Sequence, residues 1–116
     1  MGPKTTELCE RLRETSTLLR SAGDSHWAKW MDTSLRRIES SDLSGVDYLL
    51  RAFGGMGSFN DLILMSANGH SVSDANYRDV NDRLDSLRSR LYELANDVRR
   101  NATTEWLLPV DAAMGG

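Results

Sequence analysis

The chain has few of the residues that small proteins use for cross-links or metal sites. Its 116 residues include one cysteine, two histidines and two prolines. Cys9 has no second cysteine with which to form an intramolecular disulfide, and we expect a small core or boundary residue in a reducing compartment. His26 and His70 lack the paired spacing of a zinc site. We therefore expect no metal and no cofactor.

Long apolar runs are also missing. The longest, Leu62 to Met65, is far too short to cross a bilayer. The first residues, Met1 to Thr6, have no apolar core of the signal-peptide type. We therefore expect no membrane partner and a cytoplasmic location.

Positive charge is too scattered to form a nucleic-acid-binding stripe. Lys and Arg number 14 against 17 Asp and Glu, a net charge of −3. Nucleic-acid binders concentrate positive charge to displace counterions, so we expect no nucleic-acid partner. Four acids instead crowd one short region: Asp74, Asp79, Asp82 and Asp85. One interpretation is that they lie in solvent at the N-terminus of a helix, where acidic side chains complement the helix dipole. The other is that they form a docking face for a basic protein partner.

Apolar residues recur every three or four positions in four segments, which predicts four main helices. In chain order these positions are Leu8, Leu12, Leu19 and Ala22; Trp27, Trp30, Met31, Leu35 and Ile38; Val46, Leu49, Leu50 and Phe53; and Tyr77, Val80, Leu84, Leu87, Leu91, Leu94 and Val98. Gly23 ends the first helix, and Asp24 or Ser25 caps the second. A cap at Ser73 or Asp74 opens the fourth. An apolar content of 40% suffices for one core, so residues 1–116 form one domain, with residues 1–5 and 110–116 flexible.

Two of these apolar stripes allow a second interpretation. The stripe of the fourth helix is a heptad seam that faces either the other helices or a second chain. Packing inside the monomer is the default, and homodimerisation through residues 74–101 is the alternative. Trp27 and Trp30 are predicted core anchors, and the alternative is an aromatic recognition patch.

A glycine-rich corner separates the third helix from the apolar run after it. Gly54, Gly55 and Gly57 stand within four residues, and glycine tolerates positive φ and close approach of the backbone. We expect Gly54 to cap the third helix in the left-handed conformation. Ser58, with Asp61 three residues later, is typical of a cap and predicts a short helix through the apolar run. The fold class is therefore an all-α single-domain bundle of four main helices, plus one short helix after the corner.

The corner is also the first candidate binding site. If Ser58 opens a helix, the free amides of residues 58–61 point into the corner beside Asn60 and Asp61, next to an apolar wall of Met56 and Phe59. These polar groups either fasten the corner internally or receive a carboxylate, phosphate or backbone group from outside. The corner lacks the lysine and the preceding strand of a phosphate-binding loop.

No catalytic set emerges from the sequence. Asp61 with His70, or Glu93 with Asp97, could be assembled into an acid–base pair, but any helical protein offers such pairs by chance. We therefore predict that the chain is not an enzyme.

The corner and its flanks carry a resemblance to a known group of proteins. Residues 54–62, Gly-Gly-Met-Gly-Ser-Phe-Asn-Asp-Leu, come after an apolar helix and the Trp27/Trp30 segment. This arrangement resembles a group of small bacterial helical proteins with a GGMGS-hydrophobic-ND signature, over about residues 26 to 98. Several small bacterial families of this kind look like immunity proteins, which neutralise a toxin delivered by a neighbouring cell. The resemblance implies a bacterial source and a helical fold, and it transfers no catalytic residues.

Two functions from different classes are consistent with these features. The first is a non-enzymatic binding protein, in its most specific form an immunity-type inhibitor of a basic toxin. The second is a small-ligand or enzymatic site at Gly54–Asp61.

Overall fold

The protein is an all-α bundle, as predicted. The computed structural model describes residues 1–54, 56–103 and 105, and within these it has no strand. Its α-helices are α1 (Pro3–Ser21), α2 (Ser25–Glu39), α3 (Ser44–Arg51) and α4 (Tyr77–Arg100). Two 3₁₀ turns, η1 (Phe59–Asp61) and η2 (Ser66–Asn68), lie between α3 and α4. Gly55 and residues 110–116 fall outside the described residues.

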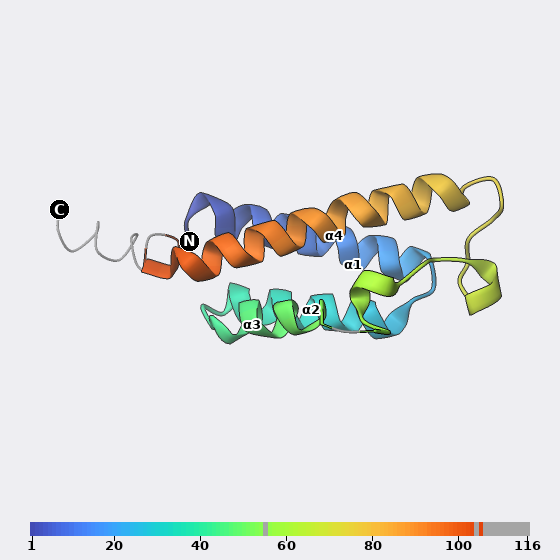
Figure 1. The fold of residues 1–116 in the computed structure, drawn as a ribbon. Helices are drawn as coiled ribbons and strands as arrows, with labels where there is room; N and C mark the ends of the chain where they lie inside the picture. Colours follow the sequence, from blue (N-terminus) through green and yellow to red (C-terminus); the bar gives the residue numbers. More distant parts are fainter. Residues whose placement is uncertain (55, 104, 106–116) are drawn as a thin grey trace.

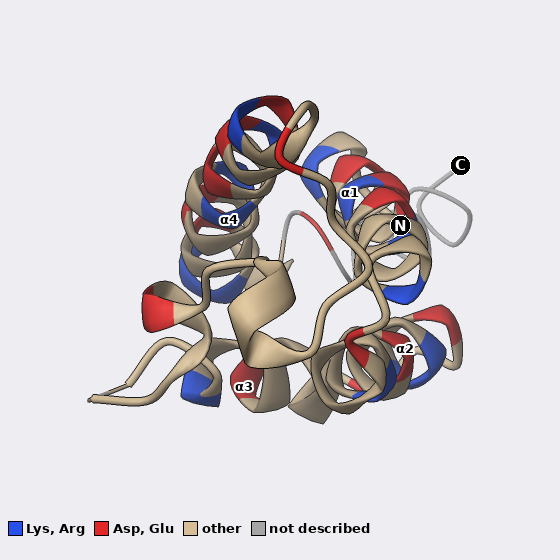
Figure 2. Cartoon of the chain, turned by 90° about the vertical axis from the view of Figure 1, so that its right-hand side faces the viewer, with Lys and Arg blue, Asp and Glu red and all other residues tan. Residues whose placement is uncertain are grey.

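The four helices run alternately up and down the bundle. α1 and α4 lie side by side in one layer, and α2 and α3 form the other layer (Figure 1). Seen from one end, the helices occupy four corners, and the segment between α3 and α4 closes the end of the bundle (Figure 2). A single apolar core runs between the layers and is lined by all four helices. This layout is expected for four amphipathic helices that each need to bury one apolar face.

The heptad seam of α4 packs inside the monomer. Leu84, Leu91, Leu94 and Val98 have no exposed surface, and Leu87 has 6%. The default interpretation of this seam is therefore correct. The seam is already occupied, so homodimerisation through residues 74–101 would have to use another face of α4 and stays a prediction.

The short helix predicted after the corner is present, but it is shorter than expected. It consists of the single 3₁₀ turn η1, Phe59–Asp61, and residues 62–65 lie outside any helix, with Leu62 and Met65 extended. Burial alternates along this stretch, since Leu64 is fully buried whereas Ile63 is 46% exposed. An uninterrupted apolar run carries no period that separates a strand-like segment from a helix. The segment continues the layer of the short helix α3 and fills the space beside the first half of α4 (Figure 1).

Among the described glycines of the corner, Gly57 and not Gly54 is left-handed. Gly57 has φ +74°, and Gly54 is not among the described glycines with positive φ. α3 ends at Arg51, with Ala52 in right-handed helical geometry, so Gly54 is not its cap. Close packing does not explain Gly57 either, because no atom lies within 4 Å of the place its Cβ would take.

The N-terminal ends of α1 and α4 differ from the sequence prediction. Residues 3–5, expected to be flexible, form the first turn of α1, and Thr5 is buried. The predicted cap of α4 at Ser73 or Asp74 is wrong, because α4 begins at Tyr77 and its N-cap residue is Asn76, with no side-chain cap hydrogen bond. Ser73 Oγ accepts from Asn76 N at 3.3 Å, but this contact and Asp74 lie in the turn before the helix.

Candidate functional site

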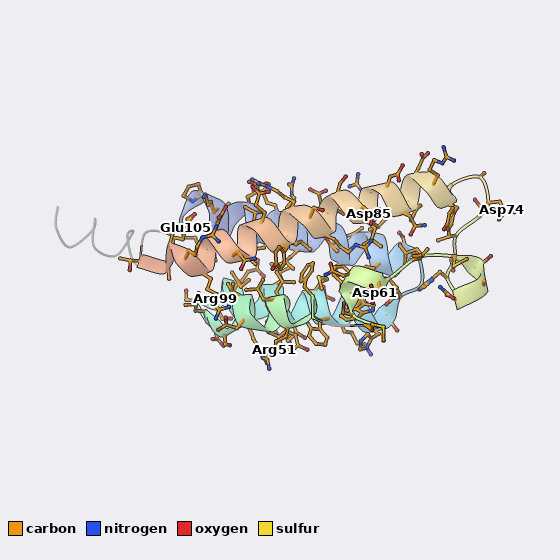
Figure 3. All side chains as sticks on the ribbon, viewed as in Figure 1. Arg51, Asp61, Asp74, Asp85, Arg99 and Glu105 are labelled. Carbon is orange, nitrogen blue, oxygen red and sulfur yellow. The ribbon has the colours of Figure 1, made fainter. Side chains whose placement is uncertain are left out.

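A groove lies between α4 and the segment after α3. Two neighbouring hollows share Asp85 and Arg88 and together extend along α4 from Tyr92 to Tyr77. We call this feature the α4 groove. Its lining residues are Phe53, Asn60, Leu62, Ile63, Tyr77, Arg78, Asn81, Asp82, Asp85, Arg88, Ser89 and Tyr92. Figure 3 labels Asp85 on α4 and Asp61 on η1.

Asn81 and Arg88 hold the wall of the groove in place. The Asn81 side chain accepts from Leu64 N at 2.8 Å and donates to Leu64 O at 2.8 Å, which satisfies both backbone groups of an extended residue. Arg88 Nη1 donates to the carbonyl oxygens of Phe59 (2.7 Å) and Leu62 (2.8 Å). Two α4 side chains therefore fix the extended segment against the helix.

Phe59 lies in the core behind the groove. It has no exposed surface, and its ring lies 5.2 Å from that of Trp27 and 5.6 Å from that of Phe53, between ring centroids. The Arg88 guanidinium lies 5.8 Å from the centre of the same ring. Burial of a phenylalanine stabilises a fold by about 2 kcal/mol, so Phe59 ties the segment after α3 to the core.

The four predicted corner residues do not assemble into one pocket. Met56 is 100% exposed, whereas Phe59 is 0% exposed, so the predicted apolar wall does not exist. Asp61 Oδ2 accepts from Gly57 N at 2.8 Å, and Asn60 Nδ2 donates to Phe53 O at 3.3 Å. Both polar residues are thus engaged within the corner, as the internal interpretation predicts. Of the four, only Asn60 lines the α4 groove.

The amides of the corner are occupied as well. Phe59 N donates to Ala52 O at 2.9 Å, and Asp61 N donates to Ser58 O at 3.0 Å. Asn60 N donates to Ser58 Oγ at 3.3 Å, so Ser58 is a cap, although of a single turn. These amides are not free to bind an external anion.

The four predicted acids separate into groups. Asp82 and Asp85 line the α4 groove, and Asp74 lines a smaller hollow at the end of the bundle with Tyr77. Asp79 is exposed on α4 outside both hollows of the groove. Asp85 is paired with Arg88, whereas the other three have no cationic partner among the described side chains.

His70 and Cys9 have structural surroundings. His70 Nε2 lies 2.9 Å from Asp24 Oδ2, and its Nδ1 accepts from Met65 N at 3.2 Å. Asp24 also caps α2 through Trp27 N at 2.9 Å, so the buried pair ties the loop to α2. Burial raises the pKa of the Cys9 thiol, which keeps it protonated. Among the described residues, no three His, Cys, Asp or Glu side chains are placed to share a metal ion.

Sequence reasoning missed Ile63, Arg88 and Tyr92. One signal was present, because Asp82, Asp85, Ser89 and Tyr92 have helical spacing and form a stripe beside the heptad seam. The opposite wall carried no such signal, since its extended backbone depends on Asn81 and Arg88 far along the chain.

Comparison with known proteins gives one finding. No curated protein and no solved structure matches the chain. In the described part, no helix has the length and apolar character needed to cross a membrane. The chain is similar, over residues 20–73, to a family described as a domain of unknown function (DUF6966), a match that runs from the end of α1 through the corner to the loop before α4.

Proposed function

We propose that the protein is a non-enzymatic binding protein whose α4 groove receives a basic protein partner. The proposal rests on one observation, the location of the exposed apolar side chains. Apart from Met1, the large apolar side chains that are strongly exposed in the described part are Met56, Ile63, Tyr77 and Tyr92. Three of them line the groove, and Met56 stands in the turn just before Asn60. Exposed apolar groups rimmed by polar ones mark interaction sites.

Charge favours a basic partner. Asp82 has no cationic partner among the described residues, and Asp85 is 64% exposed although it is paired with Arg88. Arg88 itself is only 12% exposed and is committed to two carbonyl oxygens. The Asp82 and Asp85 carboxylates are therefore more accessible to a partner than the Arg88 guanidinium. The groove also contains one exposed arginine, Arg78, but the two carboxylates would still steer a basic surface into it.

The surroundings of the reactive side chains support a non-enzymatic role. Both ring nitrogens of His70 are engaged, so neither is placed to accept a proton from a substrate. The thiol of Cys9 is buried. The alternative small-ligand site at Gly54–Asp61 has less support, because the amides of residues 59–61 and the Asp61 carboxylate already have hydrogen-bond partners within the chain.

The most specific form of the proposal is a bacterial, cytoplasmic immunity-type inhibitor of a basic toxin. Small size, net acidity and a preformed groove support it. The gene immediately upstream tests this form of the proposal. For an immunity-type inhibitor, we expect that gene to encode a large secreted protein with a toxin-like C-terminal domain. An unrelated upstream gene would count against the inhibitor hypothesis but not against the binding proposal.

The binding proposal is tested by capture from lysates of the native host at low salt. Tagged wild-type protein should recover one stoichiometric partner, and recovery should fall as salt rises because charges are screened. Asp82→Lys should weaken the isolated complex at least tenfold. Glu10→Lys, an equal charge change on the exposed side of α1, is the matched control and should bind like wild type. Failure to recover a stoichiometric partner, or equal capture by Asp82→Lys, would overturn the proposal.

A further inference from the structure

A second surface, on the outer side of α2 and α3, gathers cations that form no close ion pair. Most arginines of the described chain pair with a carboxylate within 4 Å. Among the described residues Arg36, Arg37, Arg51, Arg78 and Lys29 have no such partner, and all of them except Arg78 lie on α2 or α3. Figure 3 shows Arg51 at the edge of the bundle that points away from α4. The α4 groove is not part of this surface.

The central arginines are arranged around one aromatic ring. The Arg37 guanidinium lies 4.6 Å and that of Arg51 5.4 Å from the centre of the Tyr48 ring. Trp30 stacks on the same ring with centroids 4.6 Å apart and an angle of 20°. Trp30 Nε1 also donates to Tyr48 O at 3.0 Å, which fixes the indole to α3. We call Trp30, Arg37, Tyr48 and Arg51 the arginine–aromatic face.

This face is pre-organised for carboxylates. A guanidinium over an aromatic ring loses less freedom when it binds, and its planar fork matches a carboxylate in two hydrogen bonds. The adjoining hollow is lined by Ser25, His26, Lys29, Trp30, Thr33 and Tyr48. None of these is acidic, and the side chain of each can donate a hydrogen bond. Tryptophan, tyrosine and arginine are also the residues that most often dominate binding energy at protein interfaces.

We propose that the arginine–aromatic face is a docking surface for an acidic protein segment that presents closely spaced Asp or Glu side chains. Charge complementarity argues for this occupant and for a short one. The chain as a whole carries a net charge of −3, so a long polyanion such as a nucleic acid would be repelled beyond the face. A short acidic segment covers less of the rest of the chain and is repelled less. The proposal does not depend on the groove or on its basic partner.

The test uses a fluorescently labelled synthetic peptide rich in Glu, with a Gln-for-Glu peptide of the same length as its control. Fluorescence anisotropy at low salt should show binding of the Glu peptide only. The double variant Arg37→Glu/Arg51→Glu should weaken binding at least tenfold. Arg13→Glu/Arg83→Glu is the matched control, since it makes the same charge change at arginines that Glu39 and Glu14 already pair, and it should bind like wild type.

Each other outcome contradicts the proposal. Equal loss in the Arg13/Arg83 control would mean a general charge effect, and equal binding of a single-stranded oligonucleotide of the same charge would point to nucleic acid. Displacement of the peptide by inorganic phosphate, added at the same total concentration of negative charge as the peptide, would indicate a site for small anions. Absence of binding at low salt would leave the face without this role. Arg51→Glu alone, at an exposed position, supplies the same comparison if the double variant does not fold.

Discussion

At the scale of single residues, Gly57 shows what the corner demands of its sequence. Its φ of +74° is unfavourable for any residue with a Cβ. Its amide is used, because Gly57 N donates to Asp61 Oδ2 at 2.8 Å. The requirement at this position is therefore one of backbone conformation, since open space surrounds it.

Gly57→Ala should lower the free energy of unfolding by about 1 kcal/mol, because alanine is strained at positive φ. Gly54→Ala is the control. Gly54 lacks positive φ, and the nearest atom to the place that its Cβ would take, Arg51 O, is 3.9 Å away, so that variant should be neutral or more stable by about 0.5 kcal/mol. Urea unfolding of both variants makes the comparison. Equal effects at the two glycines would contradict the conformational argument.

At the scale of the element, α1 obtains its N-terminal cap from the far end of the chain. Gly2, its N-cap residue, makes no side-chain cap hydrogen bond. Glu105 Oε1 instead accepts from Lys4 N at 2.7 Å, and Glu105 O accepts from Gly2 N at 2.7 Å. Figure 3 shows Glu105 beside the first turn of α1. A carboxylate at this position satisfies an unpaired amide and complements the helix dipole.

Glu105→Ala should destabilise the protein by about 1 kcal/mol, the usual cost of a lost cap. Glu105→Gln keeps an acceptor oxygen and should cost less. Denaturant unfolding measures the stability, and hydrogen exchange at the Lys4 amide should become faster in Glu105→Ala. A Glu105→Ala protein with wild-type stability and unchanged exchange at Lys4 would show that the cap contributes nothing.

At the scale of the whole molecule, ion pairs join α1 to α4 across one layer of the bundle. Arg90 donates to both oxygens of Glu7, at 2.7 Å from Nε and 2.6 Å from Nη2. Lys4 Nζ lies 3.3 Å from Asp97 Oδ2. The hydrogen bonds from Arg90 and from Lys4 hold the pKa values of Glu7 and Asp97 below their ordinary ones.

Stability should therefore decrease in acid. A lowered folded-state pKa gives a contribution that is present above the unfolded pKa, about 4 for these carboxyls, and is lost as pH falls through the folded value. Glu7→Gln should lower the free energy of unfolding at pH 7 by about 0.5 kcal/mol, as partly exposed pairs do, and by less at pH 3. Glu10→Gln, at an exposed position of α1, is the control. A deficit in Glu7→Gln that is the same at both pH values would contradict this assignment.

Local chemistry is what made the helices predictable. Gly23, with φ +81°, comes just after α1, and Asp24 accepts from Trp27 N to open α2. Most of the predicted apolar positions of α4, from Leu84 to Val98, are buried, whereas Tyr77 at its start is 40% exposed. These features depend on residues three or four positions apart, so the sequence alone determined an all-α bundle and the approximate extent of its helices.

Only the tertiary structure decided the segment after the corner and both candidate surfaces. Leu64 is extended because Asn81, 17 residues away, pairs with its backbone. Arg88 fixes Phe59 from 29 residues away, and the arginine–aromatic face needs α2 and α3 to pack together. Such contacts form only when the chain has folded, and no local pattern records them. The sequence therefore determined the helices, whereas long-range packing decided what lies between them and which side chains face a partner.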